Sequence, residues 1–477
     1  MKKLIIYTSV ALAVLFTGVS CTKDLTDLNN DKKKPAGVSQ GALFASAQKE
    51  LVDAVTSTNV NLNIFRLIVQ HWQETTYLDE SRYDLNTRSI PDNFWDAIYT
   101  DVVKDLEESR GVVNADATIS DGVKKNQIAQ IEIMSVYAFS VGVNTFGDIP
   151  YKKAMDIENI FPSYDGAQAI YDDMIVRLNA AIGALDAGSG SFDNSDLIYR
   201  GDIVKWKKFA NSLKMRLGMI LADVSPAVAK KIVEEASPGA FGANDDNATF
   251  PYSTVPPNTN PLWEDLVQSQ RQDFVGANTL IDFMNARNDP RRAIFFTQRG
   301  GTYIGGNPGS SSPFSNFSGP GTLLTKKDLV GLLIDYAEVE FMRAEALERQ
   351  FAVGGTPKEH YDNAIRASFQ YWGLTTADAD TYLARPDVAY ATATGTYKQK
   401  IGEQKWVALY NRGYDAWVEW RRLDFPKLKV PNRAQSVTPL RFTYSIDEQN
   451  LNRTNYDAAA AAIGGDVVAT KLFWDKF

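Results

Sequence analysis

The chain has 477 residues, of which 44% are hydrophobic, 11% aromatic and 23% charged. This balance is typical of a globular protein and excludes collagen-like and largely disordered chains. Its 58 acidic residues outnumber its 50 Lys and Arg residues, which argues against a nucleic-acid partner because phosphate neutralisation needs an excess of basic side chains.

The N-terminus has the features of an export signal. Residues 1–3 carry positive charge, and residues 4–16 are apolar but form too short a run to span a bilayer comfortably. Small residues at 18–20 then lead into Cys21, the single cysteine of the chain, in a pattern that resembles a bacterial lipoprotein box. The sequence predicts that residues 1–20 are a signal peptide and that Cys21 is lipidated. A free core cysteine is the alternative.

After Cys21 the chain reads as a tether followed by one domain. Residues 21–40 are polar and are expected to be the lipidated tether. No linker long enough to divide the remainder is present, so residues 41–477 are predicted to form a single α-rich domain. Loop-rich inserts are expected near 223–325 and 376–400, where Gly, Pro, Ser or Asn are frequent.

Apolar residues at helical spacing predict helices through most of the domain. The stretch 128–143 is apolar nearly all round, which indicates a buried central helix. Stripes are also present over 170–185 and 202–221, and Asp202 stands where an N-cap belongs. The periodic rings Trp206, Phe209 and Phe341 are expected in the core.

The stretch 333–369 predicts a helix–turn–helix hairpin. Gly354 and Gly355 suit the end of the first helix, and Thr356 with Pro357 suits the start of the second. Such a hairpin must stack on its neighbours to bury its apolar stripe, as tetratricopeptide units do. The predicted fold class is therefore mostly α, built from tetratricopeptide-like hairpins.

Motifs of catalysis are missing from the sequence. It contains no zinc-binding motif, phosphate-binding loop or nucleophile elbow, and its two histidines are His71 and His360. We expect no metal and no cofactor, and a binding protein rather than an enzyme, with His71 in a capping or core role. Paired carboxylates for glycoside hydrolysis stay open, because only geometry identifies them.

Aromatic residues outside the predicted helices are the candidates for ligand contact. Flat rings stack on the C–H faces of sugars, while neighbouring Arg and Asp side chains bond to the hydroxyls. Two polar or glycine-rich segments carry such residues, and the candidates for ligand binding are Tyr77, Arg82, Tyr83, Asp84, Tyr303, Phe314 and Phe317. Isolated exposed rings are also common on ordinary surfaces, so a role without ligand contact is the alternative.

Several motifs in a fixed order resemble a known family. They include Phe146-Gly147-Asp148-Ile149-Pro150-Tyr151, the helix Trp206-Lys207-Lys208-Phe209-Ala210-Asn211, and the late block Glu419-Trp420-Arg421-Arg422. With further matches over 93–107, 337–346 and 439–450, the chain resembles the SusD/RagB family of Bacteroidetes outer-membrane nutrient-binding lipoproteins. The resemblance is greatest to the SusD-like, starch-binding-associating branch.

The resemblance implies a fold, a ligand and a partner. The fold would be four tetratricopeptide-like hairpins supporting a loop-rich ligand-binding face. The partner would be a SusC-like TonB-dependent transporter in the outer membrane, to which a cell-surface lipoprotein delivers oligosaccharide. An oligopeptide-binding member of the family is one alternative and an all-α glycoside hydrolase is another. The resemblance assigns no ligand-binding residue to this chain.

Overall fold

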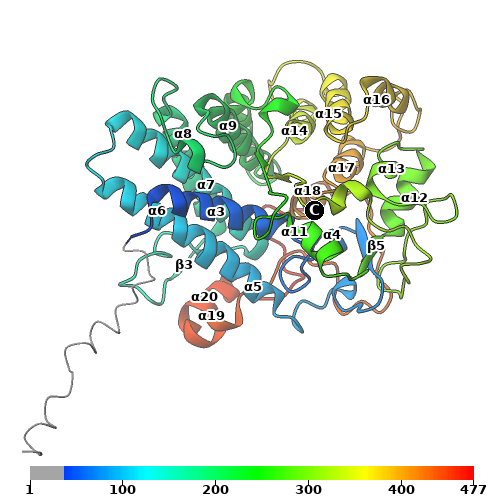
Figure 1. The fold of residues 1–477 in the computed structure, drawn as a ribbon, viewed down its shortest axis with the longest axis horizontal. Coiled ribbons are helices and arrows are strands. Elements are labelled where there is room, and N and C mark those ends of the chain that lie inside the picture. Colours follow the sequence, from blue (N-terminus) through cyan, green and yellow to red (C-terminus); the bar gives the residue numbers. More distant parts are fainter. Residues whose placement is uncertain (1–36) are drawn as a thin grey trace, which may run out of the picture. The chain divides into compact units, whose positions relative to one another are not determined.

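The computed structural model describes residues 37–477. Within it, residues 40–477 form one compact unit (Figure 1). The predicted signal peptide and Cys21 lie outside the described residues, as does most of the expected tether. Among residues 37–477, no helix combines the length and apolar character needed to cross a membrane.

The compact unit is mostly helical, as the sequence predicts. Its longer helices are α3 (Gln40–Thr56), α5 (Ile90–Asp96), α6 (Lys104–Ala115), α7 (Asp121–Phe146), α8 (Ala167–Ala184), α9 (Ile203–Ile220), α10 (Pro226–Ala236), α12 (Asn278–Ala286), α14 (Tyr336–Glu348), α15 (Pro357–Tyr371), α16 (Thr376–Leu383), α17 (Tyr397–Ala408), α18 (Gly413–Leu423) and α20 (Arg453–Ala462). Its short helices are α4 (Phe65–Ile68), α11 (Pro261–Trp263), α13 (Arg292–Phe295) and α19 (Ile446–Leu451). A π-helical turn, η2 (Ala97–Val103), joins α5 to α6.

Strands are few and short. They pair antiparallel in twos: β1 (Trp72–Glu74) with β5 (Phe274–Gly276), β2 (Ile149–Pro150) with β3 (Tyr164–Asp165), and β4 (Thr249–Phe250) with β6 (Gly331–Leu332). Each pair joins segments that are distant in sequence or flank a loop. The strand pairs therefore connect loops to one another, and the core is helical.

Consecutive helices pack as hairpins, and the hairpins stack. Helix α7 packs on α8, α9 on α10, α14 on α15 and α17 on α18. Contacts of α8 with α9, of α9 with α14 and of α14 with α17 join one hairpin to the next. Figure 1 shows α8, α9, α14 and α15 in this succession. The stack buries stripes that single hairpins would expose, which is the logic of helical repeats.

The helices predicted from periodicity are confirmed. Helix α7 buries nearly all of its residues between Asn126 and Phe146. The Asp202 side chain accepts a hydrogen bond from the Lys205 amide at the start of α9. Gly354 and Gly355 have positive φ in the α14–α15 turn, and the Thr356 side chain caps α15. The rings expected in the core, Trp206, Phe209 and Phe341, are buried.

The expected loop inserts contain more helix than the composition indicates. Helix α10 lies within 223–325 because Ala229, Ile232 and Val233 recur at helical spacing and bury their side chains. Helix α16 lies within 376–400, where Thr375 and Asp378 form a capping box. Short helices of this kind are hidden in the sequence by the Gly- and Pro-rich stretches around them.

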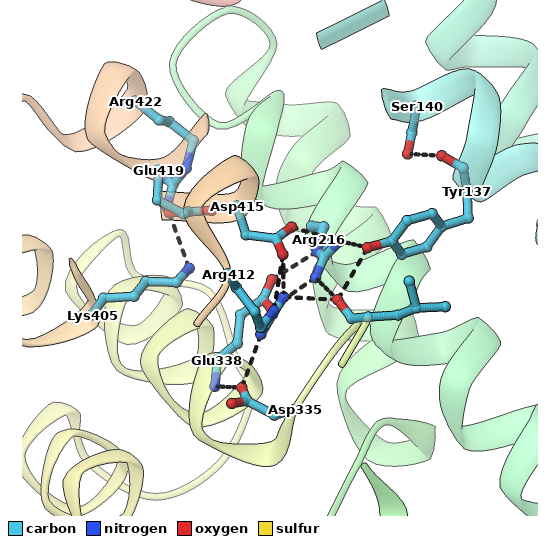
Figure 2. A network of polar contacts seen from close by, with 11 residues as sticks. Tyr137, Ser140, Arg216, Asp335, Glu338, Lys405, Arg412, Asp415, Glu419 and Arg422 are labelled. Carbon is cyan, nitrogen blue, oxygen red and sulfur yellow. Dashed lines mark hydrogen bonds and ion pairs between the residues drawn. The ribbon is translucent and has the colours of Figure 1, made fainter. Parts of the chain in front are cut away.

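A buried network of ion pairs joins the stacked hairpins (Figure 2). Arg216 on α9 donates through Nε and Nη2 to the two carboxylate oxygens of Glu338 on α14, both at 2.7 Å. Arg412 contacts Glu338 and Asp335 as well as Asp415 on α18. Burial alone would raise the pKa of Glu338, but the Arg216 and Arg412 guanidiniums outweigh it and lower that pKa. The buried charges of this network therefore lie next to charges of opposite sign.

Candidate ligand-binding site

Four segments that are far apart in the sequence form one connected surface, here called the loop face: residues 73–89, 268–276, 298–320 and 427–437. Pairing of β1 with β5 joins the first two segments. The Ser312 amide donates to the Thr75 carbonyl at 2.9 Å, and the Asn432 amide donates to the Pro308 carbonyl at 2.8 Å. The loop face is thus held by backbone hydrogen bonds between segments.

Two buried glutamines support the loop face from beneath. Gln73 accepts from the Gly309 amide at 2.9 Å and donates to the Ser310 carbonyl at 3.1 Å. Gln70 donates to the Tyr83 hydroxyl at 3.1 Å and accepts from the Lys429 amide at 3.0 Å. An amide side chain carries both donors and acceptors, so Gln70 bonds to two segments of the loop face and Gln73 bonds to two neighbouring residues of the 298–320 segment.

His71 lies between these glutamines and takes the core role that the sequence predicts. Its ring is fully buried, and Nε2 is 3.0 Å from the Trp406 carbonyl oxygen. Burial lowers the pKa of His71 to about 3, so the imidazole is neutral at physiological pH. His71 is therefore part of the floor under the loop face.

A small recess opens on the loop face beside Tyr77. Its volume is about 20 Å³, and it is lined by Val60, Glu74, Thr76, Tyr77, Arg88, Arg271 and Asp273. The Tyr77 side chain is 67% exposed, so its ring is available to a ligand. Arg271 Nε lies 2.7 Å from Asp273 Oδ2 and brings a donor group and an acceptor group to the same place. An exposed ring next to such a pair suits a ligand with both C–H faces and hydroxyls.

Two buried carboxyl groups lie at the recess: Glu74 lines it, and Glu80 contacts the lining residue Arg88. Glu74 accepts at Oε2 from the Ser81 amide at 2.9 Å, and Glu80 forms an ion pair with Arg88. Glu80 Oε2 has no hydrogen-bond partner among the described residues. Burial, followed by the neighbouring Glu80 charge, raises the pKa of Glu74 to about 9. Glu74 is therefore protonated at neutral pH and pins the start of the Tyr77 segment without adding a charge.

The structure places the other predicted residues of the first segment differently from Tyr77. Tyr83 is only 2% exposed and has φ of 67°. Arg82 donates through Nε to the Gly309 carbonyl at 3.0 Å, across 227 residues of sequence. Asp84 accepts hydrogen bonds from the Asn86 and Thr87 amides in a surface turn. In this arrangement Arg82 and Tyr83 hold the loop face together, and Tyr77 is the residue that lines the recess.

The glycine-rich segment carries the remaining predicted rings on the same loop face. The Arg292 guanidinium lies over the Tyr303 ring at 5.3 Å, and that of Arg299 lies over the Phe314 ring at 4.9 Å. Arg299 also donates through Nε to the Phe317 carbonyl at 2.7 Å. All three rings are half-buried and do not line the recess. Their contact with a ligand stays a prediction.

The sequence did not identify the four charged residues that line the recess, namely Glu74, Arg88, Arg271 and Asp273. They come from two segments, 73–89 and 268–276, which the β1–β5 pairing brings together. The one signal in the sequence is the polar run at 268–273 directly before an apolar strand. Among residues 37–477 no cluster of three or more His, Cys, Asp or Glu side chains could hold a metal ion.

A stack of helical hairpins with a loop-built face defines a helical-repeat protein. The SusD-like family, described as "Starch-binding associating with outer membrane", matches residues 32–445. This match covers most of the chain, and the chain belongs to the SusD-like family, as its motifs predict.

Solved structures agree with this assignment. A chitin-binding protein has 26% sequence identity and a TM-score of 0.80, covering 92% of this chain and 100% of its own. A chitin-binding SusD homologue from Flavobacterium johnsoniae has 26% identity and a TM-score of 0.77, covering 92% and 98%. A SusD homologue from Bacteroides uniformis has 26% identity and a TM-score of 0.79, covering 91% and 99%. A comparison with curated proteins gave no match.

Proposed function

We propose that the protein binds oligosaccharide at the loop face and delivers it to a SusC-like TonB-dependent transporter in the outer membrane. A lipid on Cys21 would hold the protein at the cell surface. The observation that carries the proposal is the exposed Tyr77 ring, which lines the same recess as the Arg271–Asp273 pair. Membership of a starch-binding family and the chitin-binding relatives at 26% identity support it.

Binding at the recess uses groups that are already in place. The Tyr77 ring packs on the C–H face of a sugar, while Arg271 donates to hydroxyl oxygens and Asp273 accepts from hydroxyl groups. The nearest carboxyl pair, Glu74 and Glu80, is buried and engaged by Ser81 and Arg88. That engagement suits a support for the loop better than an acid and a nucleophile, which favours binding without hydrolysis.

The test is binding of the protein that starts at residue 22 to starch, chitin and xylan oligosaccharides and to a peptide library. Calorimetry and affinity electrophoresis measure the affinity. We expect one glycan class to bind without release of products, and we expect Tyr77→Ala to weaken binding about tenfold or more, which corresponds to about 1.4 kcal/mol. Phe477→Ala removes a ring of the same 67% exposure and is the matched control.

Three outcomes contradict the proposal. Retention of peptides in preference to every glycan points to the oligopeptide alternative, and cleavage of a bound glycan points to a hydrolase. Equal affinity of the Tyr77→Ala and Phe477→Ala variants removes the recess as the site. For the anchor, Cys21→Ala is expected to release a folded protein from membranes, and retained attachment would contradict lipidation.

A further inference from the structure

A second cavity lies away from the loop face, between helices α6, α7 and α8 and the segment 151–156. Its volume is about 560 Å³, within the range of small-molecule sites. No loop-face residue lines it. Figure 1 shows α6 and α8 toward one side of the compact unit and β5, in the loop face, toward the other.

The cavity floor is a chain of alternating charged and polar groups from three helices and one loop. Arg110 on α6 and Arg177 on α8 both form ion pairs with Glu132 on α7, and Arg177 Nη2 lies 2.7 Å from Glu132 Oε2. Arg177 also donates through Nη1 to the Tyr151 hydroxyl at 2.8 Å, and that hydroxyl donates to Asp173 Oδ2 at 2.6 Å. The contacts fix each group before any ligand arrives.

These floor groups remain partly open to the cavity. The side chains of Arg110, Glu132 and Arg177 are 18%, 21% and 22% exposed. A guanidinium has five N–H donors and a carboxylate has about four acceptor positions, so the ion pairs leave capacity for further hydrogen bonds. Met155, which also borders two neighbouring pockets, adds an apolar edge to the cavity.

The pairing of charges selects the class of ligand. An anionic ligand would have to compete with Glu132 for the two guanidiniums, and it would meet no excess of positive charge, because four acidic and three basic side chains line the cavity. A neutral ligand with adjacent hydroxyls can accept from a guanidinium and donate to the neighbouring carboxylate while both ion pairs stay intact. The apolar edge at Met155 suits the C–H face of the same ligand.

We propose that this cavity is a second binding site for a neutral saccharide, held by Arg110, Glu132, Arg177 and Asp173. The inference goes beyond the proposed function, because it concerns a surface that the loop face does not share. A protein that captures long glycans would then contact one glycan molecule at two separate places. Two linked contacts raise the overall affinity by effective concentration without any change at either site.

The methyl group of Met155 provides a local readout for the test. The protein that starts at residue 22 is labelled at its methionine methyl groups, and a Met155→Leu variant assigns the signal. Maltotriose, chitotriose and xylotriose are then titrated to millimolar concentration. We expect a saturable shift of the Met155 signal with at least one trisaccharide, in the wild type and in Tyr77→Ala alike. A sulfated trisaccharide is expected to give a shift at least about tenfold weaker.

Two variants of the floor and one control separate binding from damage to the fold. Asp173→Asn keeps the shape of the side chain, and Arg177→Leu removes the central donor; each is expected to weaken the Met155 titration about tenfold or more. Arg453→Leu removes an exposed guanidinium on α20 and is expected to leave the titration unchanged. Circular dichroism checks that each variant is folded.

The outcomes distinguish this inference from the proposed function. Absence of a saturable Met155 shift with all three trisaccharides, or an equal shift in a folded Asp173→Asn variant, overturns the second site whatever the loop face does. If the Met155 shift persists while Tyr77→Ala leaves the calorimetric affinity unchanged, the proposed function is overturned. The second site is then still supported.

Discussion

The two arginines Arg216 and Arg271 occupy opposite environments in one compact unit. In the stacked hairpins, the Arg216 side chain is 8% exposed and meets a Glu338 carboxylate that is 1% exposed. On the loop face, the Arg271 side chain is 58% exposed and pairs with Asp273 in contact with solvent. A buried ion pair orders the groups around it, whereas an exposed pair contributes little to stability and remains able to exchange partners.

The stacked hairpins and the loop face also differ in how their segments are joined. The hairpins are joined by side-chain ion pairs and bury rings such as Trp206 and Phe341. The loop face is joined by the β1–β5 pairing, by backbone hydrogen bonds between its segments and by the amides of Gln70 and Gln73. Buried charges and rings therefore stabilise the hairpins, while the surface that would meet a ligand is held mainly by hydrogen bonds. Substitutions in the two regions should therefore have effects that differ in kind as well as in size.

The largest effect is expected from Arg216→Leu. Loss of this guanidinium leaves the buried Glu338 carboxylate with less compensation, and breaking a buried pair costs about 3–5 kcal/mol. Urea unfolding followed by tryptophan fluorescence measures the loss. Arg366→Leu breaks the exposed pair with Asp380 and should change the free energy of unfolding by less than about 0.5 kcal/mol. Equal losses in the two variants would contradict the contrast between buried and exposed pairs.

A smaller and more local effect is expected from Gln73→Ala. The substitution leaves the Gly309 amide without its acceptor, at a cost of about 1–3 kcal/mol. Hydrogen exchange should accelerate at Gly309 and its neighbours within 298–320, with little change in the stacked hairpins.

The matched control for that variant is Gln370→Ala, an exposed glutamine on α15 that contacts Thr376. Gln370→Ala should leave exchange unchanged in both regions. If Gln73→Ala accelerated exchange in α9 and α14 as much as in the loop face, the two regions would unfold as one unit, and the contrast between them would fail.

The same contrast explains how much the sequence could predict. The helix that carries Trp206 and Phe209 and the hairpin turn at Gly354 follow from local periodicity and backbone preference, and both were found. The partner of Arg216 could not be found, because it lies 122 residues away and depends on how α9 stacks on α14.

At the recess, composition selected Tyr77 and Tyr83 alike and could not separate the exposed ring from the buried one six residues away. The difference arises because the 3₁₀ turn η1 (Glu80–Arg82) ends at Tyr83 in the left-handed region, which turns that ring toward Gln70. Likewise Arg271 and Asp273 acquire a role only through pairing of β5 with β1. Local sequence patterns predict helices and turns. A site assembled from distant loops can be located only from the tertiary structure.

The smallest effect at pH 5, and one of opposite sign at higher pH, is expected from Glu74→Gln. The pKa of Glu74 rises from an ordinary 4.5 to about 9 on folding, so the folded state keeps a proton that the unfolded state releases. Stability from this group is fully present below pH 4.5 and is lost as the pH rises toward 9. Glutamine resembles the protonated carboxyl and does not titrate. The variant should therefore differ from the wild type by less than about 1 kcal/mol at pH 5 and become the more stable protein between pH 6 and 9. Unfolding free energies measured across this range test the claim. Parallel pH profiles of the two proteins would show that Glu74 is charged in the folded state. The interpretation of Glu74 as a neutral group that holds the Tyr77 segment would then be wrong.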